Sequence, residues 1–267
     1  MIDVIKQQFE DGMPMGKKLN LTREFLQILS LKILYEKGLF RNLAFVGGTA
    51  LRILYDIKRF SEDLDFSLID AKKYNFESLQ SDLSKVFHLY GLPLEIKAQS
   101  ARNVHSMMMK FTGLLKSLGL SELHGQKFSI KLEIDTNPPE GWEVTNTIVH
   151  KNYMFNILHY DLPSLFAGKL HACFYRKYTK GRDYYDLVWY LAKKVKPNFT
   201  LLNNAIKQTQ GRESEINEEN IKDFILSHIQ QVDFEFVKKD VERFLEDKKE
   251  LNLFDPRLIR ETVNQLY

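Results

Sequence analysis

Apolar and polar residues alternate most clearly in residues 127–135, where Phe128, Ile130, Leu132 and Ile134 share one face. This period of two predicts a strand with one buried side. Short apolar runs predict further strands at residues 43–46, 64–68, 94–98 and 104–111. Apolar residues at helical spacing predict helices over residues 21–37, 50–55 and 76–90, the first of them ending at Gly38.

From about residue 160 onward the apolar spacing is helical throughout. It predicts helices over residues 162–178 and 183–194 and a late helix in the region of residues 234–245, with a charged loop at residues 211–220. We therefore predict an α+β fold with two domains. Residues 1–158 form an α/β domain with an N-terminal helix, and residues 159–267 form a helical domain. A cleft between the two would be the natural ligand site.

Composition supports a globular protein with a sizeable core, because 44% of the residues are hydrophobic and 12% aromatic. Cys173 is the only cysteine, so no internal disulfide can form, which fits a reducing compartment. The chain shows neither a signal-peptide pattern nor an apolar run of the roughly 18 residues that a membrane helix needs. We expect a cytoplasmic protein without a membrane partner.

The net charge of +3 does not by itself indicate a nucleic-acid partner, so any basic binding surface would have to be local. Two basic patches stand out, at residues 169–182 and 193–196. Aromatic and small residues separate the cations of the first patch. We interpret the second as a solvated face.

A Gly-Gly-Thr turn joins the strand at residues 43–46 to the following helix. Gly47 and Gly48 let the backbone approach an anion closely, and Thr49 adds a hydroxyl donor. The N–H groups at the start of the helix suit triphosphate oxygens. The alternative is a plain tight turn.

Asp63 and Asp65 lie two residues apart at the start of the strand at residues 64–68, so they point to the same face. Two such carboxylates suit Mg²⁺ or Mn²⁺. Glu133, from another strand, can complete a cage for an in-line phosphoryl displacement, with Asp135 as the competing candidate. The alternative is a set of solvated surface acids.

Lys169 lies within the first C-terminal helix, with Cys173 and Arg176 on roughly the same side. A lysine here can counter charge on a phosphate, although an exposed helix lysine is the simpler interpretation. Asp183 suits the first turn of the next helix, and Asp186 can pair with Lys169 or Arg182. P-loop, G-x-G-x-x-G and H-E-x-x-H motifs do not occur, and we interpret His171 as structural.

Together these motifs resemble the AbiEii/AbiGii toxin family of nucleotidyltransferases, within the DNA polymerase β-like superfamily. The resemblance spans residues 45–191 and rests on five blocks, at residues 45–51, 59–66, 131–134, 167–172 and 182–187. Two positions differ from the pattern: Thr49 stands where the superfamily often has Ser, and Gly168 where many relatives have a polar or acidic residue.

The resemblance implies a minimal nucleotidyltransferase fold, a small mixed sheet flanked by helices with a helical C-terminal region. It also implies a set of site residues. Those expected to bind metal are Asp63, Asp65 and Glu133; those expected to contact phosphate are Gly48 and Thr49; and the C-terminal conserved pair is Lys169 and Asp186. We further expect nucleotide contacts at Gly47, Arg59 and Arg182.

Members of the family that the chain resembles look like toxins of type IV toxin–antitoxin or abortive-infection systems. Some relatives add nucleotides to the 3′ end of tRNA. We therefore predict a Mg²⁺-dependent (or Mn²⁺-dependent) transfer of a nucleoside monophosphate from an NTP to an RNA hydroxyl, with a cognate antitoxin as partner. Two alternatives stay open. One is transfer to a small molecule or a protein hydroxyl, and the other is a non-catalytic binding protein that keeps the fold.

Overall fold

The computed structural model describes residues 1–123 and 125–267 and contains two compact units. The first, here called the sheet unit, comprises Met1–Asp56, Phe60–Pro138 and Asn146–His159. The second, called the helical unit, comprises Ile57–Arg59, Pro139–Thr145 and Tyr160–Tyr267. The division of the chain into two domains between residues 158 and 159 stays a prediction.

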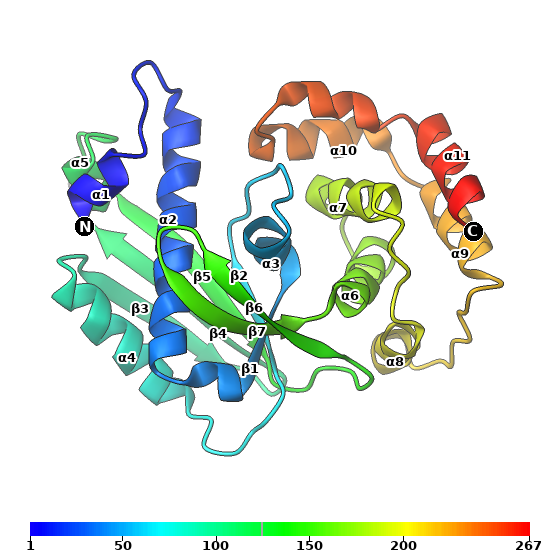
Figure 1. Ribbon diagram of the computed structural model, residues 1–267, viewed down its shortest axis with the longest axis horizontal. Helices are drawn as coiled ribbons and strands as arrows, with labels where there is room; N and C mark the ends of the chain where they lie inside the picture. The colour runs from blue at the N-terminus through cyan, green and yellow to red at the C-terminus, as the bar shows by residue number, and fades with distance from the viewer. Residues whose placement is uncertain (124) are drawn as a thin grey trace. The chain divides into compact units, whose positions relative to one another are not determined.

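A seven-stranded mixed sheet has the strand order β3-β4-β5-β2-β1-β7-β6 (Figure 1). β1 runs antiparallel to β2 and parallel to β7, whereas β2 runs parallel to β5. β3, β4 and β5 pair antiparallel. The strands are β1 (Leu43–Val46), β2 (Leu64–Leu68), β3 (Leu94–Ser100), β4 (Val104–Thr112), β5 (Lys127–Asp135), β6 (Val144–His150) and β7 (Met154–Tyr160).

The five strands predicted from apolar spacing are confirmed, and the α+β class with them, but β6 and β7 were missed. In β6 only Val149 is buried, so the strand carries almost no apolar signal. β7 does alternate, with Phe155 and Ile157 buried, while Met154 before them is 69% exposed. The alternation was therefore present but short.

Helix α2 is the longest helix of the sheet unit, and residues 25–31 of it are buried on all sides. It begins at Met15 rather than at residue 21, because Met15 and Leu19 are the only apolar side chains in residues 15–20 and do not make a helical pattern by themselves. It ends before Gly38, which adopts the left-handed conformation expected of a stop. α2 packs on α4, and α4 packs on β3. The helices here are α1 (Ile2–Lys6), α2 (Met15–Glu36), η1 (Leu39–Arg41), α3 (Gly47–Leu54), α4 (Phe76–Leu89) and α5 (Leu114–Ser117).

The helical unit confirms the helical character predicted for the C-terminal part. α6 packs on α7 and α8, while α7 also packs on α10 and α11. Among the helices of the described residues, none is long and apolar enough to cross a membrane. The elements are α6 (Leu162–Tyr175), α7 (Gly181–Ala192), α8 (Phe199–Gln210), α9 (Ile221–Ile229), α10 (Phe234–Val241), η2 (Glu242–Phe244), η3 (Lys248–Leu253) and α11 (Pro256–Leu266).

Candidate active site

Gly47 opens α3 and lies directly against the carboxylate of Asp65. Its φ of +78° is in the region that favours glycine. A Cβ atom at this position would lie 3.0 Å from Cβ and 3.1 Å from Cγ of Asp65, and closer still to Oδ2. The register explains the proximity, because Val46 of β1 pairs with Asp65 of β2. Glycine is therefore required twice over, by the backbone conformation and by the neighbouring carboxylate.

Thr49 connects α3 to the residue at which the Asp-x-Asp motif begins. Its hydroxyl, which is fully buried, donates a hydrogen bond to the backbone carbonyl of Asp63. The N-cap residue of α3 is Val46, whose side chain cannot accept a hydrogen bond. The N–H groups of the first turn, which includes the half-buried Gly48, thus have no side-chain cap and suit an anion.

The acids of the sheet unit are arranged around the pairing of two strands. Asp65 of β2 is the direct register partner of Glu133 of β5, and Asp63 immediately precedes β2. Neighbouring residues on parallel strands present side chains to the same face, so the pairing brings both carboxylates to one side of the sheet. This proximity of Asp65 and Glu133 agrees with the sequence analysis.

A lysine that the sequence analysis did not single out lies among these acids. Lys131 Nζ is 2.8 Å from Glu133 Oε1. The hydrogen bond to Glu133 raises the pKa of Lys131; burial opposes the increase, and the charges of Glu133, Asp63 and Asp65 add to it. The electrostatic fields of all three acids therefore act on one positive charge. The signal was present, because Lys131 and Glu133 are two residues apart on one strand face.

The chemistry of these acids can be compared with the ligands that a divalent cation prefers. Within the described residues, no group of three or more His, Cys, Asp or Glu side chains is gathered as a metal centre. The donor set nevertheless fits Mg²⁺ or Mn²⁺, because its oxygens are carboxylate oxygens and the acids already attract a cation. Metal binding by Asp63, Asp65 and Glu133 stays a prediction.

Asp135, the competing candidate, lies two residues beyond Glu133 at the end of β5. Burial raises the pKa of its carboxyl group, and a hydrogen bond from the backbone N–H of Asn137 only partly offsets this. Its charged form is therefore disfavoured, and its register partner is Ser67 rather than another acid. Asp135 is the weaker candidate for a cation ligand.

A hydrogen bond and a cation–π contact hold the loop before Asp63. The amide nitrogen of Gln27, in buried α2, donates to the carbonyl oxygen of Ser61 at 3.2 Å. Arg52 of α3 pairs with Glu24 of α2 at 2.5 Å, and its guanidinium lies 4.8 Å from the ring centroid of Phe60. The backbone that presents Asp63 is thus tied to the core of the sheet unit.

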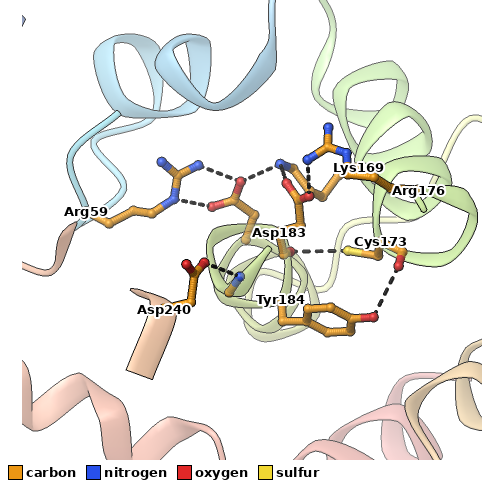
Figure 2. Close-up of polar contacts among 9 residues, drawn as sticks. Arg59, Lys169, Cys173, Arg176, Asp183, Tyr184 and Asp240 are labelled. Atoms are coloured by element: carbon orange, nitrogen blue, oxygen red, sulfur yellow. Dashed lines mark hydrogen bonds and ion pairs between the residues drawn. The ribbon is translucent and has the colours of Figure 1, made fainter. Parts of the chain in front are cut away.

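The helical unit contains a second cluster, in which cations and carboxylates alternate and all but Arg176 are largely buried (Figure 2). Arg59 donates from Nε and Nη2 to the two oxygens of Asp186, each at 2.6 Å. Lys169 Nζ lies 2.8 Å from Asp186 and 2.7 Å from Asp183. Arg176 completes the chain, 2.7 Å from the other oxygen of Asp183.

Burial and pairing act in opposite directions on these charges. Burial alone would lower the pKa of Arg59 and of Lys169, but Asp186 and Asp183 outweigh it and raise both. Burial would raise the pKa of Asp183, but Lys169 and Arg176 outweigh it and lower it. Arg59, Lys169 and Asp183 are therefore held in their charged forms.

The predicted pairing of Asp186 with Lys169 is confirmed, as is the common side of Lys169, Cys173 and Arg176, all of which contact Asp183. The interpretation of Lys169 as an exposed helix lysine is wrong, because its side chain is 11% exposed. Sequence reasoning missed that Arg59 binds Asp186, since no local pattern links positions so far apart.

The remaining predicted residues lie as follows. Arg182 places its guanidinium 4.2 Å from the ring centroid of Phe244. His171 hydrogen-bonds Thr209 at 2.8 Å, which agrees with a structural role. Nucleotide binding by Gly47, Gly48, Thr49, Arg59 and Arg182 and catalysis by Lys169 and Asp186 stay predictions.

Comparisons with known proteins address the fold and the family. The structure is similar to two crystal structures from Helicobacter pylori, a candidate nucleotidyltransferase (20% identity, TM-score 0.51, covering 92% of this chain and 97% of the other) and JHP933 (21% identity, TM-score 0.52, covering 92% and 94%). At this identity the likeness shows the fold, which confirms the predicted nucleotidyltransferase architecture.

In the sequence comparison, no curated protein matches the chain. The family model described as "Nucleotidyl transferase AbiEii toxin, Type IV TA system" matches residues 31–260. This match includes the Gly-Gly-Thr turn, the Asp-x-Asp motif, β5 and the charged cluster of the helical unit. The chain therefore belongs to the AbiEii family of nucleotidyl transferase toxins of type IV toxin–antitoxin systems.

Proposed function

We propose that this nucleotidyltransferase uses a divalent cation, Mg²⁺ or Mn²⁺, to move a nucleoside monophosphate from an NTP to an RNA hydroxyl, with the 3′ end of tRNA as acceptor. The bond between the α- and β-phosphates breaks as the new phosphodiester forms, and pyrophosphate leaves. The observation that carries the proposal is the register pairing of Asp65 with Glu133, next to the glycine turn at the start of α3. Carboxylates beside a phosphate-binding turn are what in-line nucleotidyl transfer requires.

The sheet unit would supply the metal and triphosphate contacts. Asp63, Asp65 and Glu133 would hold the cation, which neutralises triphosphate charge and activates the acceptor hydroxyl when bound. The N–H groups of Gly48 and Thr49 would bind phosphate oxygens at the helix start. Glu133 would also accept the proton of the acceptor hydroxyl. Thr49 would act through its backbone, because its hydroxyl is bonded to Asp63.

Lys169 would counter the charge that develops on the phosphate groups. An ammonium has three N–H donors, and in the described residues Lys169 gives one to Asp183 and one to Asp186. The third remains for a phosphate oxygen. Asp186 and Asp183 would thus hold the lysine in its charged form and in one orientation.

The RNA acceptor is supported by the basic and aromatic composition of residues 169–185. The family implies an antitoxin partner, and an activity that consumes NTP and modifies RNA would operate in the cytoplasm.

The test is transfer of label from each of the four α-³²P NTPs to total RNA, to total protein and to a small-molecule extract, with EDTA and with Mg²⁺ or Mn²⁺ restored. We expect label in RNA that ribonuclease removes and protease does not, and that depends on the metal. Label confined to protein or to small molecules would reject the RNA acceptor.

Variants separate catalysis from binding alone. Asp63→Asn, Asp65→Asn and Glu133→Gln should each abolish transfer and cellular toxicity, whereas Asp223→Asn, at an exposed position of α9, should not. Toxicity that persists in all three acid variants would favour the non-catalytic alternative.

A further inference from the structure

We propose that the α6–α7 loop, residues 176–180, binds a single-stranded segment of the RNA acceptor. Tyr178 stacks on an unpaired base, and Lys177 and Lys180 bind the flanking phosphates. The proposal rests on the proposed function, since it names where the acceptor of that reaction docks.

Tyr178 is the first observation, because its large aromatic side chain is 61% exposed. Arg176 Cζ lies 5.7 Å and Lys180 Nζ 5.5 Å from the centroid of its ring. The ring is thus accessible to solvent and flanked by two cations. Base–aromatic stacking combined with nearby positive charge is the usual means of holding single-stranded nucleic acid.

The charge of the loop is the second observation. Its five residues carry three positive charges and no acid. Within the described residues, Lys177 and Lys180 form no ion pair, while Arg176 is held beside the ring by Asp183 at 2.7 Å. Two cations are therefore available to phosphates and a third is fixed in place.

Anchoring of both ends of the loop is the third observation. At its end, the Gly181 N–H donates to Asp240 Oδ2 at 2.7 Å, and a Cβ on Gly181 would lie 2.9 Å from the backbone nitrogen of Val241. At its start, the ring of Phe174 stacks on His228 of α9 with centroids 4.4 Å apart. A loop held at both ends loses less conformational entropy on binding than a loose one.

The same features separate possible partners. A base inside a duplex offers no free ring face for Tyr178, so the loop should prefer single strands. An acidic protein would be drawn to the cations but would gain little from stacking on the aromatic ring. The aromatic residue between cations therefore favours RNA over protein.

The test uses the full-length protein without NTP, and a fluorescein-labelled 12-nucleotide single-stranded RNA of mixed sequence, its duplex, and poly-glutamate as probes in fluorescence anisotropy. Tyr178→Ala should weaken binding of the single strand about ten-fold, whereas Tyr178→Phe, which keeps the ring, should bind like the parent protein. Lys177→Gln should reduce the slope of log affinity against log salt by about 0.7. Circular dichroism confirms that each variant is folded.

Matched controls are Tyr35→Ala, at a tyrosine that is 45% exposed in the sheet unit, and Lys116→Gln, at an exposed lysine without an ion pair in the described residues. Both should leave affinity and salt slope unchanged. Equal binding by Tyr178→Ala and the parent protein, or equal affinity for single strand and duplex, would overturn the proposal. If Tyr178→Ala weakens poly-glutamate binding as much as RNA binding, the loop is a site for acidic protein and the proposal is wrong.

A transfer assay distinguishes failure of this inference from failure of the proposed function. If the parent protein labels RNA while Tyr178→Ala has an unchanged KM for RNA, the docking site is wrong and the function stands. If the parent protein never labels RNA but binds the single strand through Tyr178, the docking site stands and the function fails.

Discussion

Arg59 and Asp186 form a bidentate ion pair, although they lie 127 positions apart in the sequence. Both side chains are almost completely buried, at 1% and 0% exposure. Two backbone contacts secure the same segment, a β-bridge between Arg59 and Leu245 and a hydrogen bond from the Glu246 N–H to the Lys58 carbonyl. Residues 57–59 therefore belong structurally to the helical unit, although they precede Asp63 by only a few positions in the chain.

We predict that Asp186→Asn destabilises the protein by about 3–5 kcal/mol, because it leaves the buried charges of Arg59 and Lys169 without their shared carboxylate. The substitution keeps the size of the side chain, so the loss reports charge rather than packing. Urea unfolding followed by circular dichroism and by tryptophan fluorescence measures it.

The matched control is Glu218→Gln, which removes the partner of Lys196 in an ion pair whose side chains are 60% and 66% exposed. Exposed pairs contribute little, so its effect should stay below about 1 kcal/mol. If the two variants lost similar amounts of unfolding free energy, the buried Arg59–Asp186 pair would contribute no more than an exposed ion pair.

A pH dependence follows from Asp183. Although burial opposes it, pairing with Lys169 and Arg176 lowers the pKa of its carboxyl group below the unfolded value of about 3.9. A group whose folded-state pKa is lowered stabilises the protein above the unfolded pKa and loses that effect as pH falls through the folded pKa. Asp183→Asn should therefore be clearly less stable than the parent protein at pH 7, and the difference should shrink below about pH 4. Urea unfolding at pH 7, 5 and 3.5 measures this, and a difference that stays constant with pH would contradict it.

Much of the sheet could be predicted from sequence because its signals are local. β1, β2 and β5 have the predicted bounds, since each is an apolar run or a clear alternation between turn residues. β6 could not be predicted in this way, because its burial is confined to Val149 and its pairing is decided by tertiary contacts. The start of α2 at Met15 is a further case, because one exposed methionine in the first turn gives no periodic signal.

The candidate site divides in the same way. The proximity of Asp65 and Glu133 could be expected once both strands were recognised, because motif order and strand face are local properties. The Arg59–Asp186 pair could not, since nothing near either residue specifies the other. Lys131 differs from Arg59 in this respect, because its position on the same strand face as Glu133 is a local property of the sequence. Only its ion pair with Glu133 needed the structure.

We predict that Gly47→Ala lowers transfer activity by about a hundred-fold while the protein stays folded. The new Cβ would force the backbone out of a left-handed conformation and push against the Asp65 carboxylate, and a displacement of about 1 Å at a reacting centre can cost this much. Gly16→Ala is the control, because Gly16 lies in α2 and, apart from the adjoining helix backbone and its chain neighbours, nothing lies within 4 Å of the added Cβ. It should leave activity unchanged. Steady-state transfer rates with thermal unfolding of both variants measure the effect; an active Gly47→Ala would show that Asp65 has room to move.

Lys131→Met should lower the Mg²⁺ concentration that gives half-maximal activity. The ammonium is 2.8 Å from Glu133, and its charge is stabilised by Asp63 and Asp65, so it competes with a cation for the same acids. The side chains of Lys131 and Glu133 are 39% and 34% exposed, so solvent screens their attraction. Removing the lysine charge should therefore favour Mg²⁺ binding by at most about 1 kcal/mol, which corresponds to a decrease of up to about five-fold in the required Mg²⁺ concentration. Titration of activity with Mg²⁺ at saturating NTP measures the change. The control is Lys127→Met: Lys127 lies on the same strand as Lys131 but pairs with Glu95 of β3 at an exposed position. Loss of activity with an unchanged Mg²⁺ requirement would instead assign Lys131 a direct contact with the triphosphate.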